Sequence, residues 1–62
     1  MLVKLKGKRA EKGITQKEIS KMLNMAIATY NLKENGTREF SMSECIKIMK
    51  ILDCKFEDIF LQ

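Results

Sequence analysis

Residues at the amino end of the chain recur at helical spacing. Leu2, Leu5 and Arg9 fall on one face of a helix. Gly13 is a good helix terminator, because glycine readily adopts the left-handed backbone conformation found at helix ends. The pattern therefore predicts a first helix over residues 3–12.

A second helix begins at a capping box. Thr15 is followed three residues later by Glu18, a spacing at which the hydroxyl and the carboxylate each accept a hydrogen bond from a free backbone amide. Asn24 tolerates the left-handed conformation that ends a helix, so this helix is short, at about eight residues. We expect its inward face to carry Ile19, Met22 and Leu23, and its outward face Lys17, Ser20 and Lys21.

The middle of the chain predicts a third and a fourth helix. Residues 25–34 lack the alternation of a strand and close on Asn35 and Gly36, a strong stop signal. Ser41 and Glu44 form a second capping box, which starts the fourth helix. Its inward face repeats at helical spacing up to about residue 52: Met42, Cys45, Ile46, Met49 and Leu52.

A short fifth helix completes the predicted fold. Residues 56–61 are long enough for it, and Phe56, Ile59 and Phe60 would close the core. The fold class is therefore all-α: a compact bundle of five short helices in one domain over residues 1–62. A domain of this size buries only ~60% of the surface of its unfolded chain, so its stability must be modest or shared with a partner.

The net charge of +4 is concentrated at the amino end. Residues 1–12 hold five basic residues and one acidic residue, whereas the remainder of the chain is balanced. A basic segment on a neutral domain suits attraction to a polyanion. It also suits a solvated helix face, and charge alone favours neither interpretation.

Several classes of protein do not fit this sequence. It has no apolar stretch long enough for a membrane span and no secretory signal, so we expect a cytoplasmic protein without a membrane partner. Cys45 and Cys54 are interpreted as reduced core residues, since there is no histidine and no CxxC spacing to complete a metal site. The carboxylates are scattered and no phosphate loop occurs. We therefore expect neither an enzyme nor a cofactor, a small-molecule substrate or a separate ligand-binding domain.

The second and third helices, joined by a tight turn, form a helix-turn-helix unit of about twenty residues. In such a unit a helix about three turns long fits the major groove, and the helix before it presents its amino end to phosphate.

Three stretches carry a resemblance to a known family. They are Gly-Ile-Thr-Gln-Lys-Glu-Ile at 13–19, Glu-Asn-Gly-Thr-Arg-Glu at 34–39 with Tyr30 before it, and Phe-Glu-Asp-Ile-Phe at 56–60. The chain resembles the Xre family of Cro and C1-type repressors of lambdoid phages, without gaps over about residues 4 to 61. The resemblance implies a dimeric, sequence-specific regulator of transcription, with double-stranded DNA and a second copy of the chain as its partners.

The resemblance also implies roles for individual residues. Arg9 and Glu34 would form a buried ion pair between the first helix and the end of the third. The residues expected to contact phosphate are Gln16, Lys17, Tyr30, Asn35, Thr37 and Arg38, with backbone amides of the loop taking part. Tyr30 is equally well interpreted as a core residue. Antitoxins use the same domain, so an antitoxin role stays open.

The third helix departs from the family pattern. The positions that would face the bases are Ala26, Ile27, Ala28, Thr29 and Leu32, so bidentate readout by arginine or glutamine is absent. Position 26 lacks the usual capping hydroxyl, and Lys33 stands where an aliphatic core residue is common. The sequence therefore leaves open whether Leu32 or Lys33 faces the core.

Three interpretations of this apolar helix remain. Its side chains could lie against thymine methyl groups, with part of the specificity coming from DNA shape, which we favour. Alternatively, Ile27 and Leu32 are core or dimer residues and Lys33 turns out to solvent or phosphate. In the third, the motif has lost DNA binding and its apolar face binds a protein. For the dimer contact, two large apolar residues at the end of the chain, Phe60 and Leu61, are our candidates.

Overall fold

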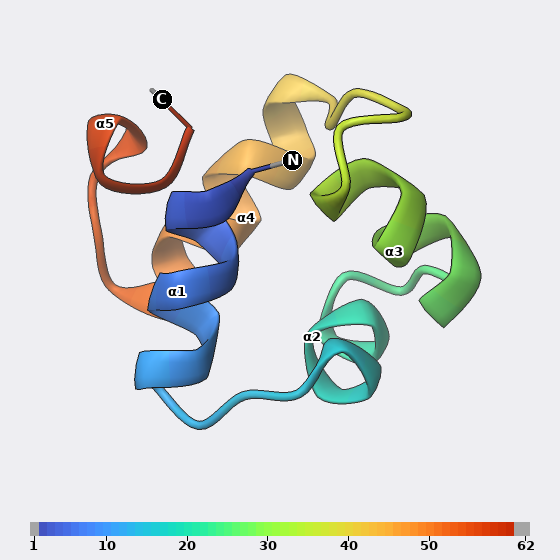
Figure 1. Ribbon diagram of the computed structural model, residues 1–62, viewed down its shortest axis with the longest axis horizontal. Coiled ribbons are helices and arrows are strands. Elements are labelled where there is room, and N and C mark those ends of the chain that lie inside the picture. Colours follow the sequence, from blue (N-terminus) through green and yellow to red (C-terminus); the bar gives the residue numbers. More distant parts are fainter. Residues whose placement is uncertain (1, 61–62) are drawn as a thin grey trace.

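The computed structural model describes residues 2–60, which form five helices and contain no strand (Figure 1). The helices are α1 (Val3–Glu11), α2 (Gln16–Met22), α3 (Ile27–Glu34), α4 (Met42–Leu52) and α5 (Phe56–Ile59). The predicted all-α bundle of five short helices is confirmed. None of the helices in residues 2–60 has the length and apolar character needed to cross a bilayer.

Both predicted capping boxes are present. The amide of Thr15 donates to Glu18 Oε1 at 2.9 Å, and the Glu18 amide donates to Thr15 Oγ1 at 3.1 Å. At α4, the Ser41 amide donates to Glu44 Oε1 at 2.8 Å, and the Glu44 amide donates to Ser41 Oγ at 3.2 Å. In contrast, Ala26 begins α3 without a side-chain cap, as its methyl group requires.

The core lies where the five helices meet. Its fully buried side chains include at least one from every helix: Leu5, Ile19, Tyr30, Ile48, Leu52 and Ile59. In Figure 1, α1 lies across α4, with α5 on one side and the α2–α3 pair on the other. α1 contacts α5 and α2 contacts α3, so the helix-turn-helix unit is one flank of the bundle.

The inward face of α2 differs from the prediction. Ile19 and Leu23 are buried as expected, but Met22 is 57% exposed, whereas Ser20 is only 3% exposed. Ser20 tolerates burial because its hydroxyl donates to the carbonyl of Lys17 at 2.9 Å. The prediction for Met22 and Ser20 was therefore wrong: α2 is rotated so that Ser20 faces the core and Met22 faces outward.

The inward face of α4 is also rotated relative to the prediction. Cys45 and Leu52 are buried, but Met42 and Ile46 are exposed and Ile48 is fully buried. Helical spacing allowed two overlapping apolar stripes, and the packing of α4 beneath the other helices selects the one that contains Ile48.

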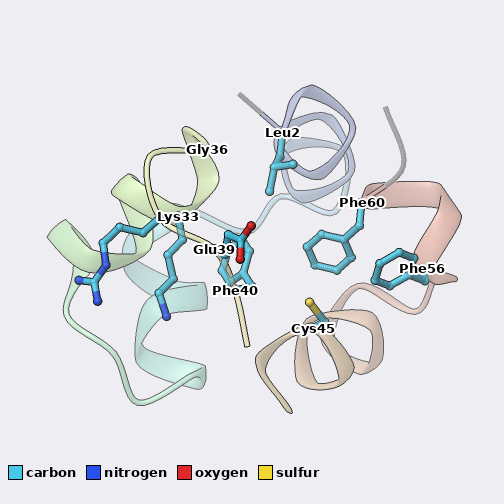
Figure 2. Close-up of a pocket in the computed structure, with 9 residues that line it drawn as sticks. Leu2, Lys33, Gly36, Glu39, Phe40, Cys45, Phe56 and Phe60 are labelled. Atoms are coloured by element: carbon cyan, nitrogen blue, oxygen red, sulfur yellow. The ribbon is translucent and has the colours of Figure 1, made fainter. Parts of the chain in front are cut away.

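Aromatic side chains fill the space beside α5. The rings of Phe40 and Phe60 lie edge to face with centroids 5.8 Å apart, and Phe56 and Phe60 are 5.1 Å apart. Figure 2 shows these rings around a hollow that is lined by the end of α3 and the loop after it, by α4 and by α5, with Leu2 and Cys45 beside the rings. Phe60 is thus half-buried and supports the core, whereas Phe56 is 40% exposed. Leu61 lies outside the described residues.

The two cysteines are free thiols, with Cys45 buried and Cys54 half-buried. Burial raises the pKa of both thiols, which keeps them protonated and weakly reactive at neutral pH. They serve as small apolar residues of the core.

Two glycines offer a paired test of the backbone. Gly7 lies inside α1, and a methyl group added there would have no heavy atom within 4 Å. We expect Gly7→Ala to stabilise the domain by about 0.5–1 kcal/mol, because alanine loses less backbone entropy in a helix. Thermal unfolding followed by circular dichroism would report this as a Tm increase of about 2–8 °C.

Gly13 provides the matched control. A methyl group there also meets nothing within 4 Å, but the backbone has a φ of +71°. Gly13→Ala should therefore destabilise by about 1–2 kcal/mol through backbone strain alone. Equal Tm changes in the two variants would contradict the assigned helix end.

Candidate nucleic-acid interface

The turn between α2 and α3 depends on one left-handed residue. Asn24 has a φ of +56°, which reverses the chain after α2 as predicted. The amide of Met25 then donates to the carbonyl of Ser20 at 2.9 Å, which closes the turn against the end of α2. α3 consequently begins only a few residues after α2 ends and packs against it.

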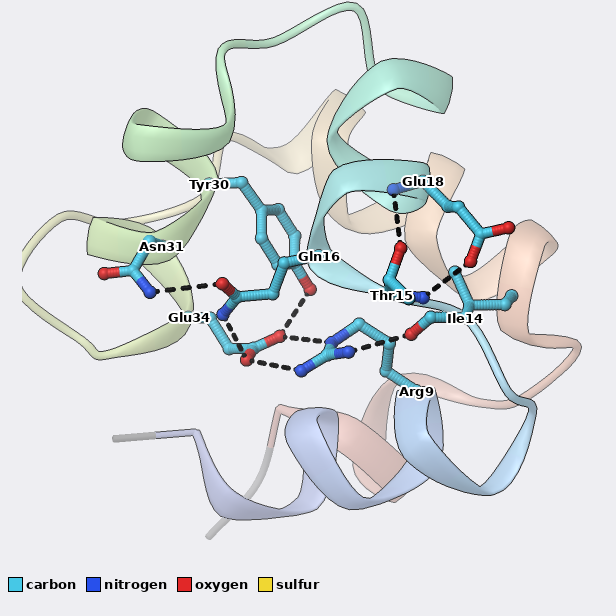
Figure 3. Close-up of polar contacts among 8 residues, drawn as sticks. All are labelled: Arg9, Ile14, Thr15, Gln16, Glu18, Tyr30, Asn31 and Glu34. Carbon is cyan, nitrogen blue, oxygen red and sulfur yellow. Dashed lines mark hydrogen bonds and ion pairs between the residues drawn. The ribbon is translucent and has the colours of Figure 1, made fainter.

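A buried polar cluster holds the inner side of α3. Arg9 of α1 binds Glu34 through two parallel contacts, Nε to Oε2 at 2.9 Å and Nη2 to Oε1 at 3.1 Å (Figure 3). The hydroxyl of Tyr30 donates to Glu34 Oε2 at 2.7 Å. The expected ion pair between Arg9 and Glu34 is therefore present, and it joins α1 to the last turn of α3.

The same cluster reaches α2. Gln16 Nε2 donates to Glu34 Oε1 at 3.0 Å, and Arg9 Nη1 donates to the carbonyl of Ile14 at 2.8 Å. Asn31 Nδ2 in turn donates to Gln16 Oε1 at 3.2 Å. One carboxylate thus links α1, α2 and α3, which determines how α3 sits in the domain.

Glu34 stays ionised in this environment. Burial raises the pKa of its carboxyl group, but hydrogen bonds from Arg9, Tyr30 and Gln16 outweigh that effect and lower the pKa below its usual value. The hydrogen bond to Glu34 raises the pKa of Arg9, and burial together with the same carboxylate raises the pKa of Tyr30. The cluster is therefore an ion pair with a neutral phenol at physiological pH.

Acid should destabilise the domain through its carboxylates. The pKa is lowered for Glu34, for Glu18 by hydrogen bonds from Thr15, and for Glu44, where burial is outweighed by hydrogen bonds from Lys33 and Ser41. A lowered pKa contributes stability above the unfolded value, about 4.3, and loses it as the pH falls through the folded value. We expect the Tm to be flat near neutrality and to fall below about pH 4.3. Glu44→Gln should show a shallower fall, and a Tm unchanged down to pH 3 would contradict the assignment.

The outward side of α3 is apolar and open. Ile27 is 48% exposed and Leu32 is 40% exposed, while Ala26 and Ala28 are exposed and Thr29 is half-buried. Ile27, Ala28 and Leu32 line a shallow hollow together with Gln16 and Asn31. Of the five residues expected to face the bases, these three therefore share one hollow, whereas Thr29 lies further round the helix.

The rotation of α3 is settled by Lys33. Its Nζ contacts both carboxylate oxygens of Glu44, at 2.7 and 2.9 Å, and lies 6.0 Å from the centre of the Phe40 ring. Lys33 therefore faces the body of the domain and Leu32 faces outward. The alternative in which Lys33 turns to solvent or phosphate is wrong, because α4 supplies a partner for its charge.

Tyr30 requires a correction among the residues expected to contact phosphate. Its side chain is fully buried and its hydroxyl donates to Glu34, so a DNA backbone has no access to it. Of its two interpretations, the structure selects the core residue.

The remaining residues expected to contact phosphate lie at the surface near α3. Lys17, Asn35, Thr37 and Arg38 are exposed, and Gln16 is half-buried within the polar cluster. A second hollow between α1, α2 and α3 brings Gln16, Lys17 and Asn35 together with Lys6. Lys6 was not singled out from the sequence, because spacing alone does not say which lysine of the basic segment faces the helix-turn-helix unit.

Backbone amides of the loop after α3 are engaged within the protein. The amides of Thr37 and Arg38 both donate to the carbonyl of Leu32, at 2.9 and 3.2 Å, and the amide of Gly36 donates to the carbonyl of Lys33 at 3.1 Å. These amides cap the end of α3, as helix ends require. A phosphate contact from Asn35, Thr37 or Arg38 must therefore use the side chain, contrary to the expectation that the amides of these residues take part.

The geometry of α2, the turn and α3 agrees with a comparison against protein families. A family model described as helix-turn-helix matches residues 5–59, which span all but the edges of the described bundle. No curated protein matches the chain. The chain therefore belongs to the Cro/C1-type, Xre-like helix-turn-helix family, whose members are DNA-binding regulators of transcription.

Proposed function

We propose that this protein is a sequence-specific transcriptional regulator that binds a two-fold symmetric operator as a homodimer. α3 enters the major groove, and α2 lies across the DNA backbone. The observation that carries the proposal is the two-sidedness of α3: Tyr30 and Glu34 are buried on one side, while Ile27, Ala28 and Leu32 are open on the other. A recognition helix needs this combination of a fixed orientation and an accessible face.

Polar and basic side chains flank the open face of α3. Lys17 and Lys6 lie beside the hollow near the start of α2, and Asn35, Thr37 and Arg38 follow the end of α3. In the proposed complex these side chains bind phosphates on either side of the major groove, which sets the register of α3 without reading sequence. The side chain of Gln16 donates one N–H to Glu34 and accepts a hydrogen bond from Asn31, so its second N–H is the donor that remains for phosphate.

A homodimer supplies the length of operator that one domain lacks. A single recognition helix covers a few base pairs, and two-fold symmetric members of this class bind half-sites about one helical turn, ~34 Å, apart. We place the dimer contact at α5, where Phe56 is partly exposed beside Phe60, with Leu61 as a further candidate from the sequence. Phe56→Asp should shift sedimentation towards monomer, whereas Met22→Asp, at an exposed methionine of α2, should not.

The repressor role of phage type rests on the family resemblance. A dimer bound across a promoter blocks access to the same DNA, so repression needs no contact beyond the operator complex. We therefore propose repression in preference to activation, with a reporter promoter carrying the operator as the assay.

A protein-binding module is the second candidate. It is favoured by the exposure of Ile27 and Leu32, because apolar side chains on an open helix face also suit a protein partner.

The salt dependence of DNA binding separates the two candidates. Fluorescence anisotropy with a labelled duplex measures the binding constant at several salt concentrations. The logarithm of the binding constant plotted against the logarithm of the salt concentration should have a slope of about −0.9 for each phosphate neutralised. For a dimer that uses Lys6, Lys17 and Arg38 on each subunit, we expect a slope of about −5. Absence of DNA binding at low salt, with the protein folded by circular dichroism, would favour the protein-binding module instead.

A further inference from the structure

We infer that this protein reads its operator mainly through the 5-methyl groups of thymine, using Ile27, Ala28 and Leu32 as an apolar reading surface. The inference rests on the proposed function and specifies its ligand chemistry: a half-site whose central contacts are thymines. Three features of α3 lead to it.

The first feature is the shape of the surface. Ile27 and Leu32 are about half-exposed and lie with Ala28 around one shallow hollow. Ala28 and Leu32 are one helical turn apart, so the small alanine leaves space between two larger side chains. A single methyl group fits a recess of this kind, whereas the edge of a polar base would lose hydration there without gaining a hydrogen bond.

The second feature is that the neighbouring amides are already engaged. Asn31 Nδ2 donates to Gln16 Oε1 at 3.2 Å, and Asn31 Oδ1 accepts from Asn35 Nδ2 at 3.1 Å. Gln16 Nε2 donates to Glu34 Oε1 at 3.0 Å. Both ends of the Asn31 side chain are therefore bonded within the protein. Figure 3 shows the part of this amide chain that runs from Asn31 through Gln16 to the buried carboxylate of Glu34. This chain opposes the bidentate pairing of asparagine with adenine.

The third feature is the helix rotation. Lys33 points to Glu44, with its Nζ 2.7 Å from Glu44 Oε1. The one basic side chain of α3 therefore lies away from the open face. Guanine, which is read by arginine or lysine in the major groove, therefore has no partner among Ile27, Ala28 and Leu32. The thymine methyl is the apolar group that unmodified DNA presents in that groove.

Removing only the methyl group tests the inference. The probe is the duplex enriched from a random library, synthesised once with thymine and once with deoxyuridine at all half-site thymines. Each contacted methyl should contribute about fourfold in Kd, the factor that corresponds to burying one methylene group. Deoxyuridine placed outside the half-sites should leave the Kd unchanged.

Matched variants locate the contact on the protein. Ile27→Ala should reduce the deoxyuridine penalty, while Ile46→Ala, the same change at an exposed isoleucine of α4, should keep it in full. Circular dichroism spectra equal to that of the unchanged protein verify that both variants are folded.

Three results would overturn the inference. The first is equal affinity for the thymine and deoxyuridine duplexes. The second is an equal deoxyuridine penalty in all three proteins. The third is a response to 5-methylation of the cytosines in place of thymine, which would assign the surface to methylated cytosine. Failure to enrich any duplex would instead contradict the proposed function itself.

Discussion

Glu34→Ala should remove most of the folding free energy of the protein. The substitution leaves the guanidinium of Arg9 buried without its bidentate partner, and it removes the acceptor for Tyr30 and Gln16 at the same time. Breaking a buried pair in this way costs about 3–5 kcal/mol. A small domain has only about 5 kcal/mol in total, so the variant should keep at most about 2 kcal/mol, and up to about half of it should be unfolded at 25 °C.

Urea unfolding followed by circular dichroism measures this loss. Glu39→Ala is the matched control, because Glu39 is an exposed glutamate in the loop that follows α3 and should change the free energy of unfolding by less than about 0.5 kcal/mol. A Glu34→Ala midpoint equal to that of the control would mean that the cluster does not hold α3 in place.

The second large effect is expected in DNA binding. The double variant Lys17→Ala/Arg38→Ala should bind each half-site of any duplex about 100-fold more weakly, since each charged hydrogen bond contributes about 1.5 kcal/mol or tenfold. In a dimer each substitution counts twice, so the loss is greater where both half-sites are occupied. The slope of log Kd against log salt should fall by about 0.9 for every phosphate contact removed.

The control for this variant is Lys50→Ala. Lys50 is exposed on α4, outside the proposed interface, and has the same charge as Lys17. Its loss should leave the salt slope unchanged. A double variant that keeps its affinity but changes its preferred sequence would contradict the assignment of Lys17 and Arg38 to phosphate.

Local signals in the sequence predicted the helices well. The capping boxes at Thr15 and Ser41, and the left-handed residues Asn24 and Gly36, depend on neighbouring residues only. For that reason the number, order and approximate ends of the helices followed from the pattern. The family resemblance added the pair of Arg9 with Glu34.

The side of each helix that faces the core could not be predicted in the same way. Ser20 tolerates burial because the carbonyl of Lys17 accepts a hydrogen bond from its hydroxyl, while the more apolar Met22 is exposed. Ile46 and Ile48 are two residues apart and so lie on nearly opposite sides of α4, and only the packing of α4 decides which of them is buried.

The candidate interface depends on contacts between distant residues. Lys33 is compatible with the core because Glu44, eleven residues away, neutralises its charge. Tyr30 was open between core and phosphate until its bond to Glu34 placed it inside. The hydrogen-bonded amides of Gln16, Asn31 and Asn35 connect α2 to α3, and the spacing of residues within either helix does not predict these bonds.

The most direct test of a sequence-specific DNA interface on α3 is selection from a random duplex library with the purified protein at near-physiological salt. We predict enrichment of a two-fold symmetric site whose half-sites lie about one helical turn apart. Failure of the folded protein to enrich any sequence would contradict a DNA interface on α3. The open face of α3 would then be assigned to binding a protein partner.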